Sequence, residues 1–258
     1  MKIDLNADIG ESYGNYKCGL DEEVVPYISS ANVACGFHAA DPVVMDKTVS
    51  LAKEHGICVG AHPGFPDLNG FGRRKMAVTP KELKAMVQYQ IGALNAFCKA
   101  YDMKLSHVKP HGAMYNMAAK DKALALAIAE GIYEVDPSLI LLGLSGSLLV
   151  EAAKETGLGG ANEVFADRAY NDDGTLVDRS QKGAVITDEE TAIQRVIEMV
   201  KNGTVKSITG KTIEVKADSV CLHGDGEKAV EFARKINAAL TAEGIEIVSM
   251  QNLLREVC

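Results

Sequence analysis

Apolar residues follow two alternating patterns along this chain. Short continuous apolar runs alternate with longer segments in which apolar residues recur every three or four positions. The short runs predict buried strands, and the longer segments predict amphipathic helices. The predicted strands are residues 2–8, 31–37, 56–61, 105–109, 139–144, 163–167, 219–223 and 245–249. Because helical segments separate them, the pattern predicts βαβ units and a mostly parallel sheet.

Capping residues mark the boundaries of several predicted helices. Asp41 provides a capping carboxylate, and Pro42 follows it at the first helical position. Thr79 with Glu82 predicts a capping box, and residues 187–190 (TDEE) predict another. Glycines that would end helices occur at Gly56, Gly157 and Gly244. These signals support the helices expected between the strands.

The number of predicted strands favours a closed sheet. About eight strands in 258 residues fit a (β/α) barrel, TIM-like or slightly irregular with seven or eight strands. A doubly wound open sheet is the alternative. Thr209-Gly210 lies between two strand-like runs and predicts a β-hairpin inserted near residues 204–216. No linker divides the chain, so we expect residues 1–258 to form one domain, with its site at the carboxyl ends of the strands.

Composition and charge narrow the classes of partner. The net charge of −8 argues against nucleic acid or an anionic membrane as a general partner. Charged residues interrupt the amino-terminal segment almost at once, and no apolar run approaches the ~18 residues of a membrane-spanning helix. The six cysteines are scattered and form no CxxC pair, so we expect reduced thiols in a cytoplasmic protein.

The first predicted strand carries polar residues on one face. Strand alternation places Asp4, Asn6 and Asp8 on the same side, which in a barrel is the side facing the lumen. An acidic lumen face is costly unless it meets water, a cation or a substrate. We therefore interpret Asp8 as a catalytic candidate and Asn6 as a substrate-binding candidate.

Histidines gather where predicted strands end. Four of the six histidines, His38, His62, His111 and His223, lie beside Gly or Pro at such ends. A single histidine there is usually structural, but four in equivalent places indicate a shared site. We take His62 and His111 as catalytic candidates, and His38, His223 and Asp225 as substrate-binding candidates.

Positive groups accompany these histidines. Arg73 and Arg74 lie in the long loop after the third strand, Lys109 ends the fourth, and Asp167 with Arg168 closes the sixth. Arginine is suited to bidentate capture of a carboxylate or phosphate. Lys109 lies between apolar neighbours and is a catalytic candidate, whereas the arginines and Asp167 are substrate-binding candidates.

A metal site remains open at this point. Asp8, His38, His62 and His111 supply nitrogen and oxygen donors that suit Zn²⁺ or Mn²⁺, although no compact motif such as HExxH is present. A nucleotide site is not indicated. Residues 209–212 (TGKT) resemble the end of a phosphate loop, but the position of its first glycine is Val205.

Six segments carry a family resemblance. They are residues 4–11 (DLNADIGE), 32–42 (NVACGFHAADP), 60–74 (GAHPGFPDLNGFGRR), 108–116 (VKPHGAMYN), 163–168 (EVFADR) and 221–225 (CLHGD). In these segments the chain resembles the LamB/YcsF family, apart from Ala40, where we expect Gly. His107 lies outside the family pattern.

The resemblance implies both a fold and an activity. The fold is a (β/α) barrel akin to the glycoside hydrolase/deacetylase superfamily. The activity is that of 5-oxoprolinase, which opens 5-oxo-L-proline to L-glutamate with hydrolysis of ATP to ADP and phosphate. It belongs to a complex with subunits B and C, and ATP, with Mg²⁺, is the co-substrate. Two alternatives stay open: a stand-alone metal-dependent deacetylase or amidohydrolase, and a non-catalytic substrate-binding subunit.

The reaction assigns roles to the candidate residues. Water must attack an activated ring carbon, which requires a base and stabilisation of developing negative charge. We expect Asp8 or His111 as the base and Lys109 with His62 as the stabilising groups. Arg73 or Arg74 would hold the substrate carboxylate or a phosphate.

Overall fold

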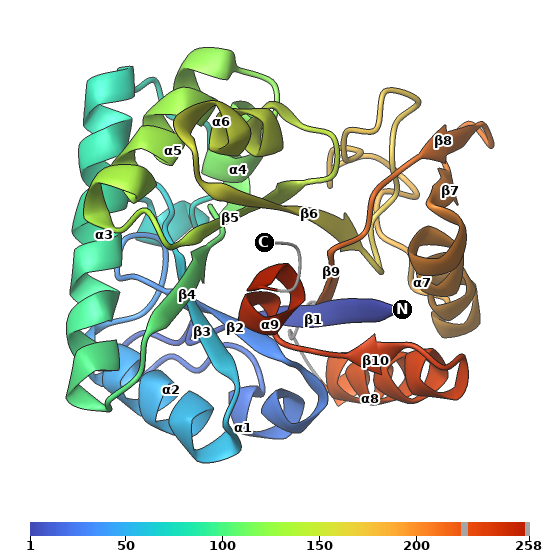
Figure 1. Cartoon of the computed structure of the whole chain (residues 1–258), viewed down its shortest axis with the longest axis horizontal. Helices are drawn as coiled ribbons and strands as arrows, with labels where there is room; N and C mark the ends of the chain where they lie inside the picture. The colour runs from blue at the N-terminus through green and yellow to red at the C-terminus, as the bar shows by residue number, and fades with distance from the viewer. Residues whose placement is uncertain (223–226, 256–258) are drawn as a thin grey trace.

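Seven parallel strands close into a ring in the computed structural model, which describes residues 1–222 and 227–255 (Figure 1). The strands are β1 (Lys2–Ile9), β2 (Ser30–Ala34), β3 (Cys58–His62), β4 (Leu105–Val108), β5 (Ile140–Leu144), β6 (Gly159–Phe165) and β9 (Ser219–Leu222). They follow one another around the ring, and β9 pairs with β1 to close it. The predicted barrel is therefore confirmed, and an open sheet is excluded.

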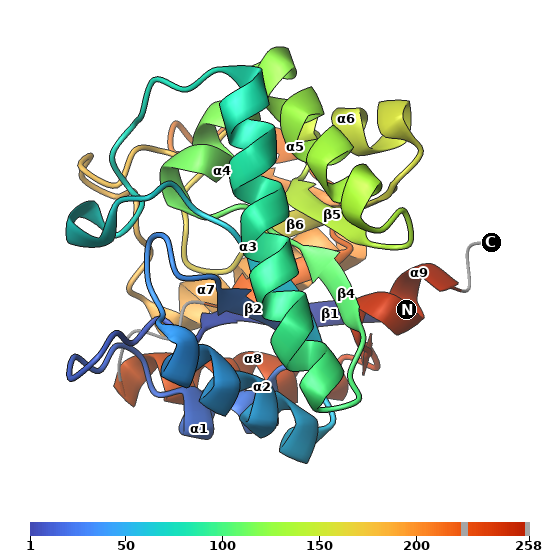
Figure 2. The same cartoon turned by 90° about the vertical axis from the view of Figure 1, so that its left-hand side faces the viewer.

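Helices surround this ring and cover its outer face. They are α1 (Asp21–Val24), α2 (Pro42–His55), α3 (Pro80–Ala100), α4 (Gly112–Ala118), α5 (Lys122–Val135), α6 (Leu148–Thr156), α7 (Glu189–Asn202), α8 (Glu227–Ala242) and α9 (Met250–Arg255), with the short 3₁₀ helices η1 (Val25–Tyr27) and η2 (Leu68–Gly70). Figure 2 shows α3 crossing the outside of the strands. Ile3, Leu5 and Ala7 of β1 are fully buried in the main apolar core, to which the helices also contribute. This confirms the predicted alternation of β1.

Most of the predicted helix caps are present. The Asp41 side chain accepts hydrogen bonds from two backbone amides at the start of α2, and Thr79 forms the predicted capping box at the start of α3. The prediction for residues 187–190 was displaced by one residue. Asp188, not the preceding threonine, caps α7 by accepting a bond from the amide of Thr191.

The predicted hairpin is present, but the eighth predicted strand does not enter the ring. Strands β7 (Thr204–Lys206) and β8 (Thr212–Glu214) pair antiparallel across the turn at Gly210. Strand β10 (Glu246–Ile247) pairs only with the start of β1, at Lys2 and Ile3. Because β9 and β2 occupy the two edges of β1 beyond this point, β10 has no place in the closed wall.

Strand β6 begins four residues earlier than the apolar pattern predicted. Its first residues are Gly159 and Gly160, which in the sequence have the character of a turn. A Cβ added at Gly160 would lie 3.2 Å from the Cβ of Ala153 in α6. The glycine therefore permits close packing between helix and strand, which an apolar pattern does not reveal.

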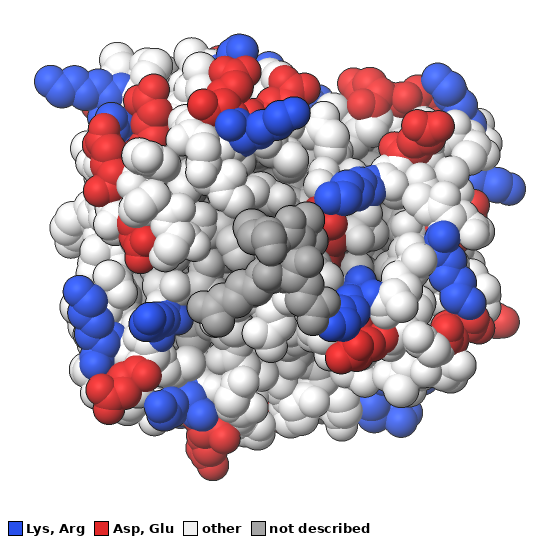
Figure 3. Space-filling view, in the orientation of Figure 1, with Lys and Arg blue, Asp and Glu red and all other residues white. Residues whose placement is uncertain are grey.

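The two ends of the barrel differ. Helix α9 lies across the opening seen in Figure 1, and Met250 at its start is buried with Ile140, Leu142 and Ala161 at the amino-terminal half of the ring. On the same face, acidic and basic side chains are interspersed without a patch of one sign (Figure 3). The carboxyl ends of the strands lie at the opposite end, where the loops gather.

Two properties of the described residues bear on the predicted environment. Over 1–222 and 227–255, no helix combines the length and apolar character needed to cross a bilayer. The cysteines in these ranges, Cys18, Cys35, Cys58, Cys98 and Cys221, are all free thiols.

Candidate functional site

Lys109 lies at the centre of the ionisable groups in the barrel. It follows β4, and its side chain is almost completely buried. Its Nζ lies 2.8 Å from Asp8 Oδ1 and 2.8 Å from Glu163 Oε1, and it donates to Asn6 Oδ1 at 3.2 Å. Burial would lower the pKa of this ammonium, but the charges of Asp8 and Glu163 outweigh that effect and hold the pKa well above its ordinary value. Lys109 is therefore a fixed positive charge.

Glu163 is held on its other side by a phenol. Tyr115 donates to Glu163 Oε2 at 2.7 Å, and both side chains are buried. Burial, together with the charge of Glu163, raises the pKa of Tyr115 well above its ordinary value, so Tyr115 remains a donor. The Lys109 ammonium also lies 5.5 Å from the centroid of the Phe165 ring. Lys109 thus bridges two buried or half-buried carboxylates, with an aromatic ring beside it.

Backbone carbonyls fix the orientation of two neighbouring imidazoles. Nδ1 of His62 lies 2.7 Å from the carbonyl oxygen of Lys109, and Nε2 of His111 lies 2.8 Å from that of Phe71. A carbonyl only accepts, so each of these nitrogens carries a hydrogen. The remaining nitrogens, His62 Nε2 and His111 Nδ1, face each other at 3.0 Å. Asp8 Oδ2 lies 3.3 Å from His62 Nε2.

His38 and Glu11 complete this cluster. The His38 ring stacks on the His111 ring at 3.7 Å with an angle of 3° between planes. Neither ring nitrogen of His38 has a hydrogen-bond partner among the described residues, and its Nε2 lies 3.5 Å from Glu11 Oε1. Burial lowers the pKa of His38 and of His111 well below the ordinary value, so both imidazoles are neutral.

The loop carrying His38 requires unusual backbone. Ala40, where the family resemblance predicts Gly, has a φ of 68°, in the left-handed region that favours glycine. A Cβ at Gly64 would lie 2.5 Å from His38 Nδ1, so only glycine leaves room for the ring there. Phe71, whose carbonyl orients His111, also has a positive φ, of 53°. Such strain is typical of functional sites.

Four of these side chains could hold one metal ion. Glu11, His38, His62 and His111 each offer one ligand atom, and these atoms all lie within 4.8 Å of one another. The sequence predicted Asp8 in the place of Glu11. Asp8 instead directs Oδ1 to Lys109 and to the side-chain amide of Asn32, which donates to it at 2.8 Å.

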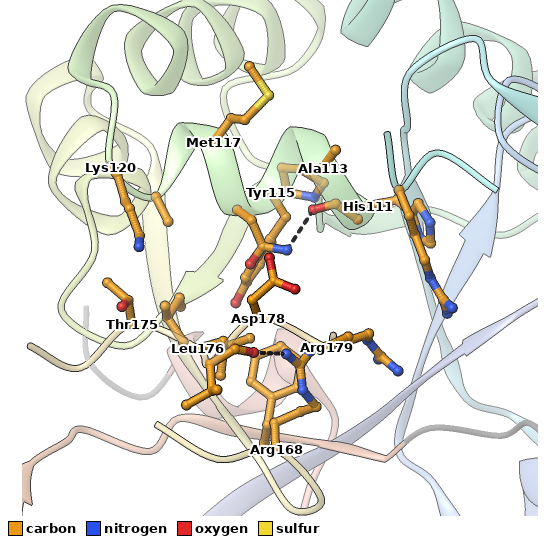
Figure 4. A pocket seen from close by; sticks show the side chains of 18 of the residues that line it. His111, Ala113, Tyr115, Met117, Lys120, Arg168, Thr175, Leu176, Asp178 and Arg179 are labelled. Atoms are coloured by element: carbon orange, nitrogen blue, oxygen red, sulfur yellow. Dashed lines mark hydrogen bonds between the residues drawn. The ribbon is translucent and has the colours of Figure 1, made fainter. Parts of the chain in front are cut away.

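A cavity of about 520 Å³ opens above Asp8, His62, Lys109 and His111. Figure 4 shows Lys120 and Arg179 on opposite sides of it, with Tyr115 and Asp178 between them. Its six cationic lining residues are Arg73, Lys75, Lys109, Lys120, Arg168 and Arg179, and its three carboxylates are Asp8, Glu11 and Asp178. The excess of positive charge suits a small anionic ligand.

The two predicted loop arginines differ in position. Arg73 lines the cavity, with its guanidinium 5.0 Å from the centroid of the Phe71 ring. Arg74 does not line it, so the prediction of a substrate contact there is not supported. Its guanidinium pairs with Asp67, which also accepts from the amide of Gly70 at the start of this turn. Asp67, which caps the turn, therefore holds Arg74 away from the cavity.

Asn6, predicted to bind substrate, lies below the cavity. It is fully buried and does not line the cavity. Its amide donates to Ser219 Oγ at 2.7 Å and accepts from Asn32 at 2.7 Å, and His107 Nε2 lies 2.8 Å from the Asn32 oxygen. Gly60 makes room for this histidine, since a Cβ there would lie 2.1 Å from its Nε2. Asn6 lies deeper than Asp8 because β1 runs on towards the mouth.

The remaining predicted residues have other positions. Arg168 lines the cavity, but it donates to the carbonyls of Val177 at 2.6 Å and Ala184 at 3.4 Å, and so orders residues 169–185. Burial lowers its pKa to about 10. Asp167 does not line the cavity. His223 and Asp225 lie outside the described residues.

Three residues of the cluster were missed by sequence reasoning. Glu11, Glu163 and Tyr115 all lie within the segments that carry the family resemblance. Glu163 had a further signal, because it is the single charged residue of β6. The prediction relied on residues at strand ends, whereas Glu11 and Tyr115 lie beyond the ends of β1 and β4 and Glu163 lies before the end of β6.

Comparisons with known proteins identify the family and support the fold. The family model described as "LamB/YcsF family" matches residues 3–255. A Clostridium beijerinckii protein named as the A subunit of 5-oxoprolinase is 66% identical over 98% of this chain and 99% of its own length. One of the same name from Thermococcus onnurineus is 59% identical over 99% and 100%. A crystal structure of the lactam utilization protein from Thermus thermophilus has a TM-score of 0.91 at 49% identity, covering 96% of this chain and 100% of that one.

Proposed function

Because the chain belongs to the LamB/YcsF family, we propose that it is the A subunit of an ATP-dependent 5-oxoprolinase, working with partner subunits B and C. The overall reaction would convert 5-oxo-L-proline to L-glutamate while ATP becomes ADP and phosphate. One structural observation carries the proposal. A permanently charged Lys109 lies between Asp8 and Glu163 at the floor of a cation-rich cavity.

The cavity suits the substrate. The volume of about 520 Å³ lies within the range of small-molecule sites, roughly 300–1,000 Å³. Oxoproline carries one carboxylate, and Arg73 presents its guanidinium at the cavity wall. We assign Arg73 to the substrate carboxylate, since a guanidinium binds a carboxylate through two parallel bonds.

Asp8 and Lys109 would divide the chemistry. Water attacks the ring carbon, which ATP has activated by phosphorylating the lactam oxygen. The ring C–N bond breaks, the nitrogen takes up a proton and becomes the amino group of glutamate, and the phosphoryl group is released as phosphate. Asp8 lines the cavity and would accept the proton of the attacking water. His111 is the weaker candidate for the base, because its free nitrogen faces His62. Lys109 would stabilise the negative charge that develops on oxygen.

The nucleotide chemistry is assigned to the partner subunits. Residues 209–212 resemble a phosphate loop in sequence, but the described structure places them at the turn of the β7–β8 hairpin and not before a helix. We therefore propose that subunits B and C bind ATP with Mg²⁺ and activate the lactam. The free thiols of the described residues suit the reducing cytoplasm, where we expect the complex to work.

Reconstitution tests this division of labour. Release of glutamate and phosphate would be measured with this chain alone, with B and C alone, and with all three subunits. We expect coupled release only from the complete set. Coupled turnover by the single chain, or full turnover without it, would contradict the proposal. The non-catalytic alternative predicts that Asp8→Asn leaves both oxoproline binding and turnover intact, whereas we expect binding with loss of turnover.

A further inference from the structure

In the described part of the chain, no hydrogen-bond donor other than each other's ring reaches the facing nitrogens of His62 and His111, and the carboxylate of Asp8 lies 3.3 Å from His62 Nε2. The carbonyls of Lys109 and Phe71 take the hydrogen of each ring on its far side. The two near nitrogens then present lone pairs to each other at 3.0 Å, which is repulsive unless a cation lies between or beside them. That cation is either an additional proton or a metal ion.

Two further donors point to the same place. The His38 ring is buried, its nitrogens have no hydrogen-bond partner in the described ranges, and Nε2 lies 3.5 Å from Glu11 Oε1. That Glu11 oxygen lies 3.7 Å from His111 Nδ1. An additional proton on the His62–His111 pair would leave the nitrogens of His38 without a partner, whereas a metal ion would use all four groups.

The separations agree with a small coordination sphere. Ligands at the Zn²⁺ bond length of about 2.1 Å lie about 3.4 Å apart in a tetrahedron. Three of the separations, 3.0, 3.5 and 3.7 Å, bracket this value, and all four ligand atoms lie within 4.8 Å of one another. The stacked rings of His38 and His111 would tilt from parallel so that both lone pairs meet one ion. The backbone carbonyls that hold His62 and His111 are the outer partners that metal-binding histidines usually have.

We propose that Glu11, His38, His62 and His111 bind one divalent transition-metal ion of the zinc class at the floor of the cavity. Three imidazoles and one carboxylate favour Zn²⁺ and Co²⁺ over Mg²⁺ or Ca²⁺, which prefer oxygen ligands. Asp8 lies beside the set: Lys109 and Asn32 hold its Oδ1, its Oδ2 lies 3.3 Å from His62 Nε2, and it is not among the four residues whose ligand atoms all lie within 4.8 Å of one another. The ion would place a second positive charge beside Lys109. Binding is independent of the reaction proposed above.

The test uses the full chain, stripped of metal with a chelator and titrated with Zn²⁺ or Co²⁺. We expect one ion per chain by calorimetry and visible absorption of Co²⁺ in a nitrogen and oxygen environment. His38→Gln and Glu11→Gln should each weaken binding by at least about 100-fold, since loss of an outer partner alone costs about 10–100-fold. Circular dichroism would confirm that the variants fold. If His38→Gln does not fold, Glu11→Gln alone tests the ligand set.

Two controls define the ligand set. His55→Gln, on the exposed end of α2, should bind as the parent does. Asp8→Asn should keep its affinity within a few-fold, and a loss equal to that of Glu11→Gln would overturn the assignment of Glu11. Absence of 1:1 binding would overturn the site, as would imidazole ¹⁵N spectra showing a proton shared by His62 and His111 in the presence of Zn²⁺. Failure of metal binding would leave the reconstitution result, and so the proposed function, unaffected.

Discussion

Two layers of polar side chains fill the barrel, and their hydrogen bonds are satisfied in different ways. The inner layer consists of Asp4, Asn6, Asn32, His107 and Ser219, and the mouth layer of Asp8, Glu11, His38, His62, Lys109, His111 and Glu163. Each inner side chain is bonded to others of its layer or to nearby serines. In the mouth layer, His38 lacks a hydrogen-bond partner among the residues that the structure describes, and the nitrogens of two imidazoles that each donate to a backbone carbonyl on the far side face each other. A polar residue in the lumen is therefore not by itself a sign of function, because one whose hydrogen bonds are satisfied by neighbouring side chains is explained by structure alone.

The largest expected effect tests the mouth layer. Lys109→Met keeps side-chain length and removes the charge, so turnover of the assembled complex should fall by on the order of 100-fold or more. Without the Lys109 charge, Asp8 and Glu163 would be two neighbouring carboxylates with no cation between them. A double variant that also carries Glu163→Gln removes one of these charges, and thermal unfolding would show that it folds. Lys47→Met, at an exposed ion pair with Glu22, is the matched control. Near-normal turnover of Lys109→Met would contradict its assigned role.

The next effect belongs to the inner layer and depends on pH. Burial raises the pKa of Asp4 to about 6 from 3.8. The folded state thus favours the protonated carboxyl, and the stability this provides at low pH is lost as pH rises from about 4 through about 6. The loss should be about 3 kcal/mol. Urea unfolding across this range should show that Asp4→Asn removes that part of the slope. Equal slopes in both proteins would mean that Asp4 is not the responsible group.

A milder change should separate stability from activity. Ser219→Ala removes the hydroxyl that bonds the side chains of Asp4 and Asn6. Leaving such buried groups short of a partner costs about 1–3 kcal/mol. We expect the free energy of unfolding to fall by this amount, while turnover per folded molecule stays within a few-fold. If turnover fell as far as in Lys109→Met, the distinction between the layers would fail.

The smallest effect concerns the rim of the mouth layer. Arg73→Met should weaken binding of 5-oxoproline about tenfold, or about 1.4 kcal/mol, with little change in kcat. Arg74→Met is the matched control, because that neighbour pairs with Asp67 and does not line the cavity. Titration calorimetry would compare the two. Equal losses would return Arg74 to the site.

The sequence contained the fold but not the depth of each residue within it. Apolar runs gave the strands, and alternation along β1 correctly placed Asp4, Asn6 and Asp8 on one face. It could not show which of them reaches the cavity, because depth depends on the stagger between strands far apart in the chain. Asn6 was assigned to the substrate for that reason, although Ser219, 213 residues away, holds it in the inner layer.

The partners of the mouth layer were equally invisible to local patterns. Histidines at strand ends indicated a shared site, and His38, His62 and His111 do meet. Glu11 and Glu163 were missed because the residues that they contact are distant in the sequence, so no local pattern indicates these contacts. Those contacts arise only when the ring closes.

Residue 109 contributes to the site in two ways that differ in their sensitivity to mutation. Its side chain carries the charge, and one codon change can abolish that. Its main-chain oxygen fixes the tautomer of His62, and it is present whichever amino acid is encoded. Sequence drift could thus silence the lysine while leaving the neighbouring imidazole correctly oriented, so a lineage that lost this charge would retain part of an ordered site on which another chemistry could be built.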